Sequence, residues 1–337
     1  MTPTLEVTDL NVRFALGHGG GDDGGVHAVN GVSFAVERGQ TVAIVGESGS
    51  GKSVTCLSLL RLLPRNARVT GSVRLEGQEL LSLSETDIRR IRGRGIGLVY
   101  QDPMAALNPV RTIGAQVAEP LRLHLGLSRR AAAERAAELL GTVGIPSPRQ
   151  QLKAYPHEFS GGMRQRVVIA MAIACEPKVL LADEPTTALD VSVQAQILEL
   201  LKNLTTELGI SLVLVSHDLS VVAGLADDAL VMYGGFLAEQ GDALEIFERP
   251  AHPYTAGLLA SIPDTAPDPD AELIGIAGQP PDMREVPPGC VFAPRCGFAF
   301  DQCGQRPPLE PRGPAHRAAC WLGPEVNLGE RIGRGAA

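Results

Sequence analysis

The sequence lacks long apolar runs and is poor in aromatic residues. Aromatic residues make up 4% of the 337 residues, with a single Trp, so we expect a core built mainly of aliphatic side chains. The most apolar stretches, residues 179–182 and 210–215, fall short of the roughly 18–20 residues that span a bilayer, and we expect them to be buried strands. Residues 1–14 lack a basic start followed by an apolar core, so we expect no secretory signal.

The sequence also lacks an excess of positive charge. It carries 30 Lys and Arg against 38 Asp and Glu, a net charge of −8. Because a general nucleic-acid binder needs a basic surface to displace counterions, we expect no nucleic-acid partner. A nucleotide is not excluded, since backbone N–H groups and one lysine can hold its phosphates. A hydrophobic content of 44% excludes disorder of the whole chain.

Short apolar segments alternate with helical segments, a pattern that predicts an α/β fold with a parallel sheet. The expected strands are residues 4–14, 28–37, 41–45, 70–77, 178–182 and 210–215. The expected helices are residues 52–63, 128–140 with Ser128 as N-cap, and 191–208. We expect a glycine-rich surface loop at 17–25, a helical insertion at about 106–165, and a Pro-rich linker after 262. Two domains follow, residues 1–262 and a small C-terminal module at 263–337.

One segment fits the pattern G-x-x-x-x-G-K-S/T, the P-loop: Gly46-Glu-Ser-Gly-Ser-Gly-Lys-Ser53. It follows the expected strand 41–45 and precedes an expected helix, which is the context this motif requires. Glycines let backbone N–H groups converge on phosphate oxygens, and the helix N-terminus adds partial positive charge. We expect Lys52 to reach the β- and γ-phosphates and the Ser53 hydroxyl to ligate Mg²⁺.

Two carboxylates, Asp183 and Glu184, end the apolar strand at 178–182. Ligands in open α/β sheets bind at the carboxyl ends of the strands. We therefore expect Asp183 to approach Mg²⁺, and Glu184 to polarise a water molecule that attacks the γ-phosphate.

Further motifs resemble those of ABC ATPases. Phe159-Ser-Gly-Gly-Met-Arg-Gln-Arg166 resembles the signature motif of that family, with Phe159 where leucine is commonest. Gln101 is similar to the Q-loop glutamine, Ala188-Leu-Asp190 to the D-loop, and His217 to the switch histidine. All occur in the family's order, which implies a P-loop NTPase (RecA-like) core with an antiparallel β subdomain, the helical insertion and the C-terminal cysteine module.

The resemblance implies a head-to-tail pair of subunits with ATP and Mg²⁺ between the P-loop of one and the signature motif of the other. It implies Glu184, His217 and Gln101 as catalytic residues, with Mg²⁺ held by Ser53, Gln101 and Asp183. An aromatic ring stacks on adenine in this family, and we expect Phe14 in that role, with His27 as the alternative. The remaining expected nucleotide contacts are Gly46, Glu47, Ser48, Gly49, Ser50, Gly51, Lys52, Val54, Ser160, Gly161, Gly162 and Asp190.

Three other segments resemble the ATPase subunits of oligopeptide and dipeptide importers. They are Gln101–Pro109, Tyr155–Ser160 and Arg249–Thr255, and the tail from Gly289 to Cys320 is similar as well. Nickel importers share these motifs and stay an alternative, and a soluble ABC regulatory protein is a more distant one. The resemblance implies two transmembrane permease subunits, a separate extracytoplasmic binding protein and a peripheral place on the cytoplasmic face of the cell membrane.

Four of the six cysteines, Cys290, Cys296, Cys303 and Cys320, crowd into the C-terminal module. Their spacing is not that of a C-x-x-C zinc ribbon. Four thiolates suit a 4Fe–4S cluster or another metal, which would stabilise a module with little core of its own. Zinc and free or disulfide-linked thiols stay open. We expect His316 to support a local turn, and Cys56 and Cys175 to be buried as small apolar residues.

Overall fold

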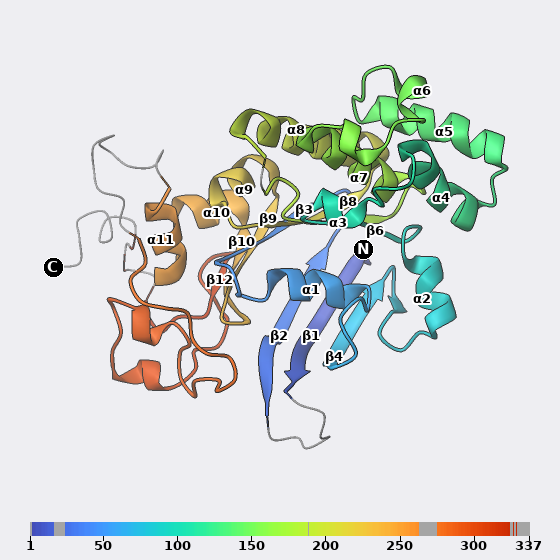
Figure 1. Ribbon diagram of the computed structural model, residues 1–337. Helices are drawn as coiled ribbons and strands as arrows, with labels where there is room; N and C mark the ends of the chain where they lie inside the picture. Colours follow the sequence, from blue (N-terminus) through green and yellow to red (C-terminus); the bar gives the residue numbers. More distant parts are fainter. Residues whose placement is uncertain are drawn as a thin grey trace. The chain divides into compact units, whose positions relative to one another are not determined.

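The computed structural model describes residues 2–16, 24–187, 189–262, 275–323, 326 and 328. The chain forms two compact units. Unit 1 comprises Met1–Glu6, Ala35–Gln40 and Arg74–Val215, and unit 2 comprises Val7–Phe34, Thr41–Val73 and Ser216–Ala337. The expected α/β class is confirmed (Figure 1).

The strands are β1 (Leu5–Ala15), β2 (Gly25–Val36), β3 (Thr41–Val45), β4 (Ala67–Leu75), β5 (Gln78–Glu79), β6 (Ile96–Val99), β7 (Val179–Asp183), β8 (Ser211–Ser216), β9 (Asp228–Tyr233), β10 (Phe236–Asp242), β11 (Glu310–Pro311) and β12 (Arg317–Ala318). The helices are α1 (Lys52–Leu59), α2 (Glu85–Ile91), α3 (Pro103–Ala106), α4 (Ile113–Leu125), α5 (Arg129–Thr142), α6 (Pro148–Gln151), α7 (Gly161–Ile173), α8 (Val191–Leu208), α9 (Leu219–Leu225), α10 (Ala243–Glu248) and α11 (Pro253–Ala260). The helix expected at 52–63 ends earlier, at Leu59, because Arg61 adopts a left-handed φ of 52° that an α-helix cannot contain.

Unit 1 is built on the parallel strands β6, β7 and β8, in which Val179 pairs with Ile96 on one side and Ser211 on the other. Every residue of β7 and β8 is buried, as expected for strands covered on both faces. Between β6 and β7 the chain forms α3 to α7, of which α4, α5 and α6 gather at one end (Figure 1). The extent predicted for the helical insertion, residues 106–165, stays a prediction.

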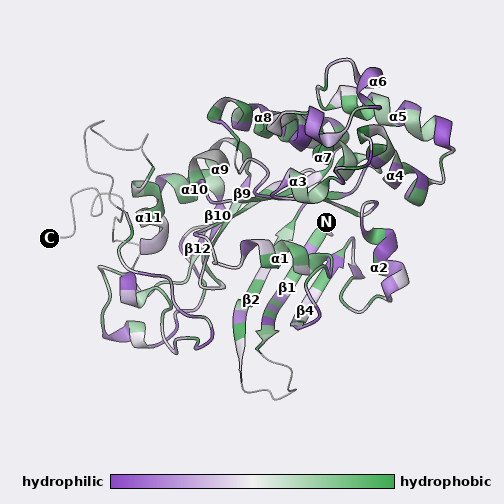
Figure 2. Ribbon diagram, in the orientation of Figure 1, coloured by the Kyte–Doolittle hydropathy of each residue, from purple (hydrophilic) through white to green (hydrophobic). Residues whose placement is uncertain are grey.

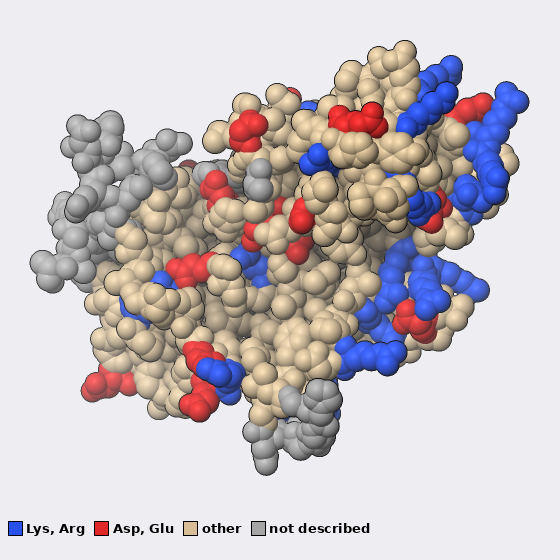
Figure 3. All heavy atoms as spheres, viewed as in Figure 1, with Lys and Arg blue, Asp and Glu red and all other residues tan. Residues whose placement is uncertain are grey.

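Amphipathic spacing explains the packing of the helices in unit 1. Ser128 caps α5 as expected, its hydroxyl accepting a hydrogen bond from the Ala131 N–H at 3.2 Å. Ala132, Ala136 and Leu140 follow at intervals of one helical turn and are fully buried, and α5 contacts α4 and α7. The arginines at the end of α2, by contrast, lie on the surface and pair with Glu85 and Asp87 of its first turn, so that side chains of opposite charge adjoin there (Figure 3).

In unit 2, β3 pairs in parallel with β9, and β9, β10, β12 and β11 follow as antiparallel neighbours. The strands β2, β1 and β4 lie side by side in a second sheet, and hydrophobic and hydrophilic residues alternate along them (Figure 2). The strand β12, which belongs to the C-terminal module, therefore lies in the same sheet as β3, the strand that ends just before the P-loop.

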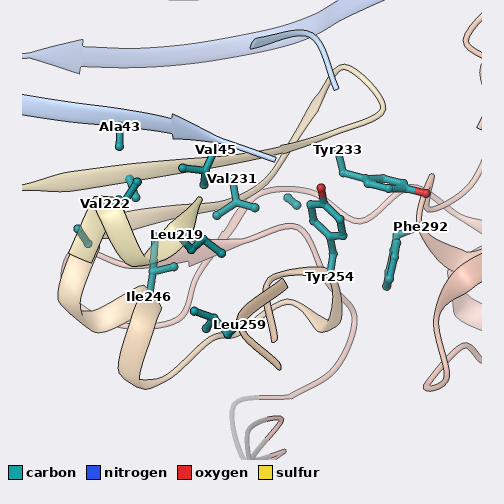
Figure 4. Close-up of a cluster of buried hydrophobic side chains, with 13 residues drawn as sticks. Ala43, Val45, Leu219, Val222, Val231, Tyr233, Ile246, Tyr254, Leu259 and Phe292 are labelled. Atoms are coloured by element: carbon teal, nitrogen blue, oxygen red, sulfur yellow. The ribbon is translucent and has the colours of Figure 1, made fainter. Parts of the chain in front are cut away.

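One buried cluster of unit 2 is mainly aliphatic except at one end, where three aromatic rings meet (Figure 4). Tyr254 of α11 lies 4.6 Å from Tyr233 of β9 and 5.4 Å from Phe292 of the C-terminal module, measured between ring centroids. Cys290 and Cys296 pack against the same cluster. The C-terminal module thus shares a core with the strands and helices of unit 2.

Candidate nucleotide site

The P-loop lies in unit 2, between the fully buried strand β3 and helix α1. Gly46 and Gly51 have φ angles of 148° and 102°. A Cβ on Gly46 would lie 2.2 Å from the Met232 carbonyl oxygen, and one on Gly51 would lie 2.4 Å from that of Ala28. Only glycine fits these two positions, so the backbone forms a tight loop of the kind that accepts phosphate.

Lys52, the first residue of α1, is held inside this loop. Its Nζ donates hydrogen bonds to the carbonyl oxygens of Gly46 at 2.7 Å and Glu47 at 2.9 Å, and the residue is 4% exposed. Gly51, the N-cap residue of α1, has no side chain that could cap the helix. Ser53 and Val54 follow on the first turn of α1 and are half-buried. Lys52 thus brings one positive charge to a helix N-terminus, the arrangement that a phosphate needs.

Glu47 makes contacts that the sequence did not indicate. Its carboxylate accepts two hydrogen bonds from the Arg295 guanidinium, at 2.7 and 3.1 Å. Its N–H donates to the Tyr254 hydroxyl at 2.7 Å. The P-loop is therefore tied to α11 and to the C-terminal module of the same unit.

In unit 1, the structure brings Glu184 and Gln101 together. Asp183 is the buried last residue of β7, and Glu184 follows it with a φ of 43°. The Glu184 Oε2 accepts hydrogen bonds from Gln101 Nε2 and from Thr187 Oγ1, both at 3.0 Å. A left-handed φ is uncommon for a glutamate, and such backbone strain concentrates at functional sites. The contact with Thr187 was not foreseen.

The signature residues also lie in unit 1, at the start of α7. The Ser160 hydroxyl accepts a hydrogen bond from the Met163 N–H at 3.3 Å and caps the helix. Gly161 and Gly162 form the first turn, where a Cβ on Gly162 would lie 2.6 Å from Val193 Cγ1. Gly162 therefore packs against α8, whereas Gly161 is exposed, and the first turn of α7 can offer backbone N–H groups to a ligand there.

Asp190, expected in the D-loop, caps α8. Its carboxylate accepts hydrogen bonds from the Ser192 hydroxyl at 2.7 Å and the Val193 N–H at 3.0 Å. Both bonds lower the pKa of Asp190, and the bond from Ser192 has the larger effect. Ala188 of the same motif lies outside the described residues.

Phe14, His27 and His217 belong to unit 2. Phe14 is half-buried near the end of β1. His27, on β2, lines a cavity of about 300 Å³ together with Arg13 and Arg68, and Phe14 is not among the residues that line it. His217 is exposed in a turn after β8, held by a hydrogen bond from the Asp218 N–H to the Ser216 hydroxyl at 3.0 Å. The role of each residue stays a prediction, and most of the glycine-rich stretch at 17–25 lies outside the described residues.

The four cysteines of the C-terminal module line one small cavity, closed on other sides by aromatic rings that include Phe292, Phe298 and Trp321. All four are free thiols. Burial raises the pKa of Cys290 and Cys320, and it raises that of Cys296 to about 11. In the part of the chain that the structure describes, no three His, Cys, Asp or Glu side chains converge as metal ligands. Among the described residues the four cysteines thus line one cavity without converging as a closed ligand set, and the expected 4Fe–4S cluster stays a prediction.

His316 does more than support a turn. Its Nε2 lies 2.6 Å from the Oε1 of Glu239, and both side chains are buried. The Glu239 carboxylate also accepts hydrogen bonds from the N–H groups of Ala251 at 2.7 Å and His252 at 3.1 Å. This network joins β10, the start of α11 and the C-terminal module.

Comparison with known proteins places these motifs in one family. The family described as "ABC transporter" matches residues 29–187. The "oligopeptide transport ATP-binding protein OppD" of Salmonella typhimurium is 48% identical over 94% of this chain and 93% of its own length. The "dipeptide transport ATP-binding protein DppD" of Bacillus subtilis is 49% identical over 96% and 95%. The chain belongs to the ABC transporter ATP-binding proteins. As a member of that family it is an ATPase.

A second family, described as "Oligopeptide/dipeptide transporter, C-terminal region", matches residues 238–303. Solved ABC structures are similar too. The dimeric post-hydrolysis structure of the ATP-binding cassette MJ0796, bound to ADP and Pi, is 28% identical with a TM-score of 0.62, and the match covers 71% of this chain and 98% of that one. The ABC transporter subunit cbiO1 of Clostridium perfringens is 29% identical with the same TM-score, covering 74% and 92%.

Sequence reasoning missed several residues that organise the site of this ABC ATPase. Arg295, Tyr254 and Glu239 contact partners far away in the chain, and no local pattern signals such contacts. Across the described ranges, no helix combines the length and apolar character needed to cross a bilayer.

Proposed function

We propose that this ABC ATPase drives the import of dipeptides and oligopeptides across the cytoplasmic membrane. The observation that carries this proposal is the match of residues 238–303 to the oligopeptide/dipeptide transporter C-terminal region. It is supported by relatives whose names describe oligopeptide and dipeptide transport over nearly the whole chain. Residues 1–262 are proposed to form the ATPase domain and 263–337 the module of this subgroup.

The phosphates of ATP bind at the P-loop in this proposal. Lys52 and backbone N–H groups between Gly46 and Val54, other than the Glu47 N–H that donates to Tyr254, contact the phosphates, and Phe14 stacks on adenine. The support is chemical: a lysine at a helix N-terminus and glycines at positions where a Cβ would clash with backbone. Mg²⁺, which ATP carries into the site, is held by Ser53, Gln101 and Asp183, all oxygen donors of the kind this ion prefers.

Glu184 positions and deprotonates the attacking water, Gln101 orients it, and His217 contacts the γ-phosphate. Support for the first two roles comes from the 3.0 Å hydrogen bond between Gln101 and Glu184. A carboxylate that accepts from an amide and a hydroxyl keeps a fixed orientation, which a general base requires.

The second half of each nucleotide site comes from a partner ATPase subunit, identical or paralogous, through Ser160, Gly161, Gly162 and Asp190. Support comes from the capped α7, whose first turn offers backbone N–H groups to phosphate, and from the dimer of the similar cassette bound to ADP and Pi. Two membrane-embedded permeases and an extracytoplasmic binding protein complete the assembly. The chain lies peripherally on the cytoplasmic face of the membrane.

The hydrolytic role is tested with Glu184→Gln. Hydrolysis is expected to fall roughly 100- to 10,000-fold, the range for loss of a general base, while MgATP binding persists. Glu199→Gln, which changes an exposed glutamate of α8, is the matched control. Unchanged turnover in Glu184→Gln would refute the role of Glu184.

The substrate is tested by purifying the tagged chain from its own membranes. We expect permease subunits and a binding protein in the complex, and a bound peptide identified by mass spectrometry. Bound nickel in place of peptide would favour the nickel importer instead.

We also propose that Cys290, Cys296, Cys303 and Cys320 hold a 4Fe–4S cluster. The support is the cavity that all four line and the softness of four thiolate ligands. Anaerobically purified protein should contain about four iron and four acid-labile sulfide per chain. Zinc, or no metal at all, would overturn this assignment.

A further inference from the structure

We propose that Arg295 is a positioning residue for nucleotide binding: from the C-terminal module it neutralises and fixes Glu47, the second residue of the P-loop. The proposal rests on the proposed ATP site and deepens it. It gives the module a direct part in the ATPase reaction.

The contact between the two side chains is bidentate. Arg295 Nη1 lies 2.7 Å from Glu47 Oε2, and Nη2 lies 3.1 Å from Oε1. The Arg295 side chain is 5% exposed and that of Glu47 is 27% exposed. The planar fork of a guanidinium matches a carboxylate in two parallel hydrogen bonds, which fix orientation as well as charge.

Arg295 is itself held rigidly. It donates hydrogen bonds to the carbonyl oxygens of Ala277 at 2.9 Å and Ile276 at 3.0 Å, and its Nη1 lies 3.3 Å from the Tyr233 hydroxyl. It ends the short 3₁₀ helix Ala293–Arg295, which follows the buried Phe292. The hydrogen bond to Glu47 raises the pKa of Arg295 above its ordinary value, so the guanidinium stays charged.

Every polar group of Glu47 is engaged. Its N–H donates to the Tyr254 hydroxyl, its carbonyl oxygen accepts from Lys52 Nζ, and its carboxylate accepts from Arg295. Lys52, which is proposed to contact phosphate, therefore shares a partner with Arg295. A substitution of Arg295 can therefore shift Lys52 through a single intervening residue, Glu47.

The charge of Glu47 makes this contact important for function. A carboxylate inside a phosphate-binding loop repels the phosphates, and Arg295 supplies the compensating positive charge from a sequence position 248 residues away. Without Arg295, the repulsion from Glu47 should increase with the charge of the nucleotide, so that binding of a triphosphate is weakened more than binding of a diphosphate.

The test uses the full chain, with binding of MgADP and a non-hydrolysable ATP analogue measured by calorimetry. Arg295→Gln should raise the Kd of the triphosphate about tenfold, equivalent to about 1.4 kcal/mol, and that of ADP by about threefold. Glu47→Gln removes the repulsive charge while the Arg295 charge remains, so it should lower the Kd of both nucleotides, that of the triphosphate more than that of ADP. The double variant Arg295→Gln/Glu47→Gln should recover most of the lost affinity, and Arg295→Lys should be intermediate.

Arg284→Gln is the matched control, because Arg284 pairs with Asp282 on the surface of the same module. Thermal unfolding of each variant separates loss of fold from loss of affinity. If the contact were merely structural, Arg295→Gln and Glu47→Gln would both weaken nucleotide binding, and equally for the diphosphate and the triphosphate. That result would overturn the proposal, as would unchanged affinity in Arg295→Gln. A wild-type chain that bound neither nucleotide would instead refute the proposed ATP site, and the role of Arg295 with it.

Discussion

Lys52 supplies the positive charge closest to the backbone of the P-loop. Its Nζ bonds to two loop carbonyl oxygens and the residue is almost fully buried. Replacing it by alanine removes the charge that offsets the developing negative charge in phosphoryl transfer, so we expect kcat/KM for ATP to fall about 100-fold or more. Steady-state release of phosphate measures this loss.

Lys178→Ala provides the control for this prediction. Lys178 forms an exposed ion pair with Glu76 in unit 1. Its replacement should leave hydrolysis within about twofold of wild type, since exposed pairs contribute little. Comparable turnover in Lys52→Ala and wild type would contradict the role given to Lys52.

At the residue scale, the sequence identified those side chains whose chemistry demands a fixed spacing. The P-loop, Gln101 and Glu184 could be found because a phosphate or a water molecule imposes the same residues wherever it binds. Arg295 could not be found in this way, because its partner Glu47 is 248 residues away and nothing near Arg295 in the sequence indicates that contact. Glu239 could not be found for the same reason, since its partner His316 is 77 residues away.

At the scale of single elements, the start of α7 offers two adjacent glycines with different surroundings. A Cβ at Gly162 would lie 2.6 Å from Val193 Cγ1 of α8, whereas one at Gly161 would lie 3.4 Å from Leu189 Cδ2. We expect Gly162→Ala to lower the free energy of unfolding by about 1–3 kcal/mol through overpacking, and Gly161→Ala to change it by less than about 1 kcal/mol. Urea denaturation measures both, and equal effects would contradict the packing described for α7 and α8.

The start of α11 should make stability depend on pH. His252 is buried, and its Nδ1 accepts a hydrogen bond from the Tyr254 N–H at 3.0 Å. Burial, with a smaller effect from Arg312, lowers the pKa of His252 to about 3. Below pH 6.5 the unfolded chain binds a proton that the folded chain does not, so stability falls with falling pH. Between pH 7 and 5.5 we expect a loss of about 1.3 kcal/mol from this residue.

His252→Asn tests this expectation, because asparagine can still cap α11 and does not titrate. The variant should lose less stability than wild type between pH 7 and 5.5, measured by chemical denaturation at each pH. His157→Asn, at an exposed histidine, serves as control. If wild type and His252→Asn lost the same amount, the neutral buried state of His252 would be wrong.

The elements themselves were predicted well where periodicity was strong. The helix expected at 191–208 matches α8, and the strand at 41–45 matches β3. Nothing was predicted for β9 to β12 or for α9 to α11, because short segments that pack mainly through long-range contacts carry little periodic signal. The shared aromatic core of Tyr233, Tyr254 and Phe292 arises from this unpredicted part.

At the scale of the whole molecule, the C-terminal module is connected to the ATPase at several independent points within unit 2. It contributes β12 to the sheet, Phe292 to the core, His316 to a buried carboxylate and Arg295 to the P-loop. If the module separated from the rest of unit 2, the buried groups that these four contacts pair would lose their partners, which is energetically costly. We therefore expect the module to fold together with the rest of unit 2. Ligand binding at the P-loop should consequently stabilise the module as well.

Thermal unfolding with and without nucleotide tests this coupling. MgATP at about 100 times its Kd should raise the free energy of unfolding of the Glu184→Gln chain by about 2.7 kcal/mol, and the midpoint by about 5 °C. The fluorescence of Trp321, which lines the cysteine cavity, should report the same shift as circular dichroism. Removing Mg²⁺ with EDTA should reduce the shift, because the phosphate charges lose their counterion, and Lys52→Ala should abolish it. A Trp321 transition that stayed fixed while circular dichroism shifted would mean that the module unfolds independently of the nucleotide site.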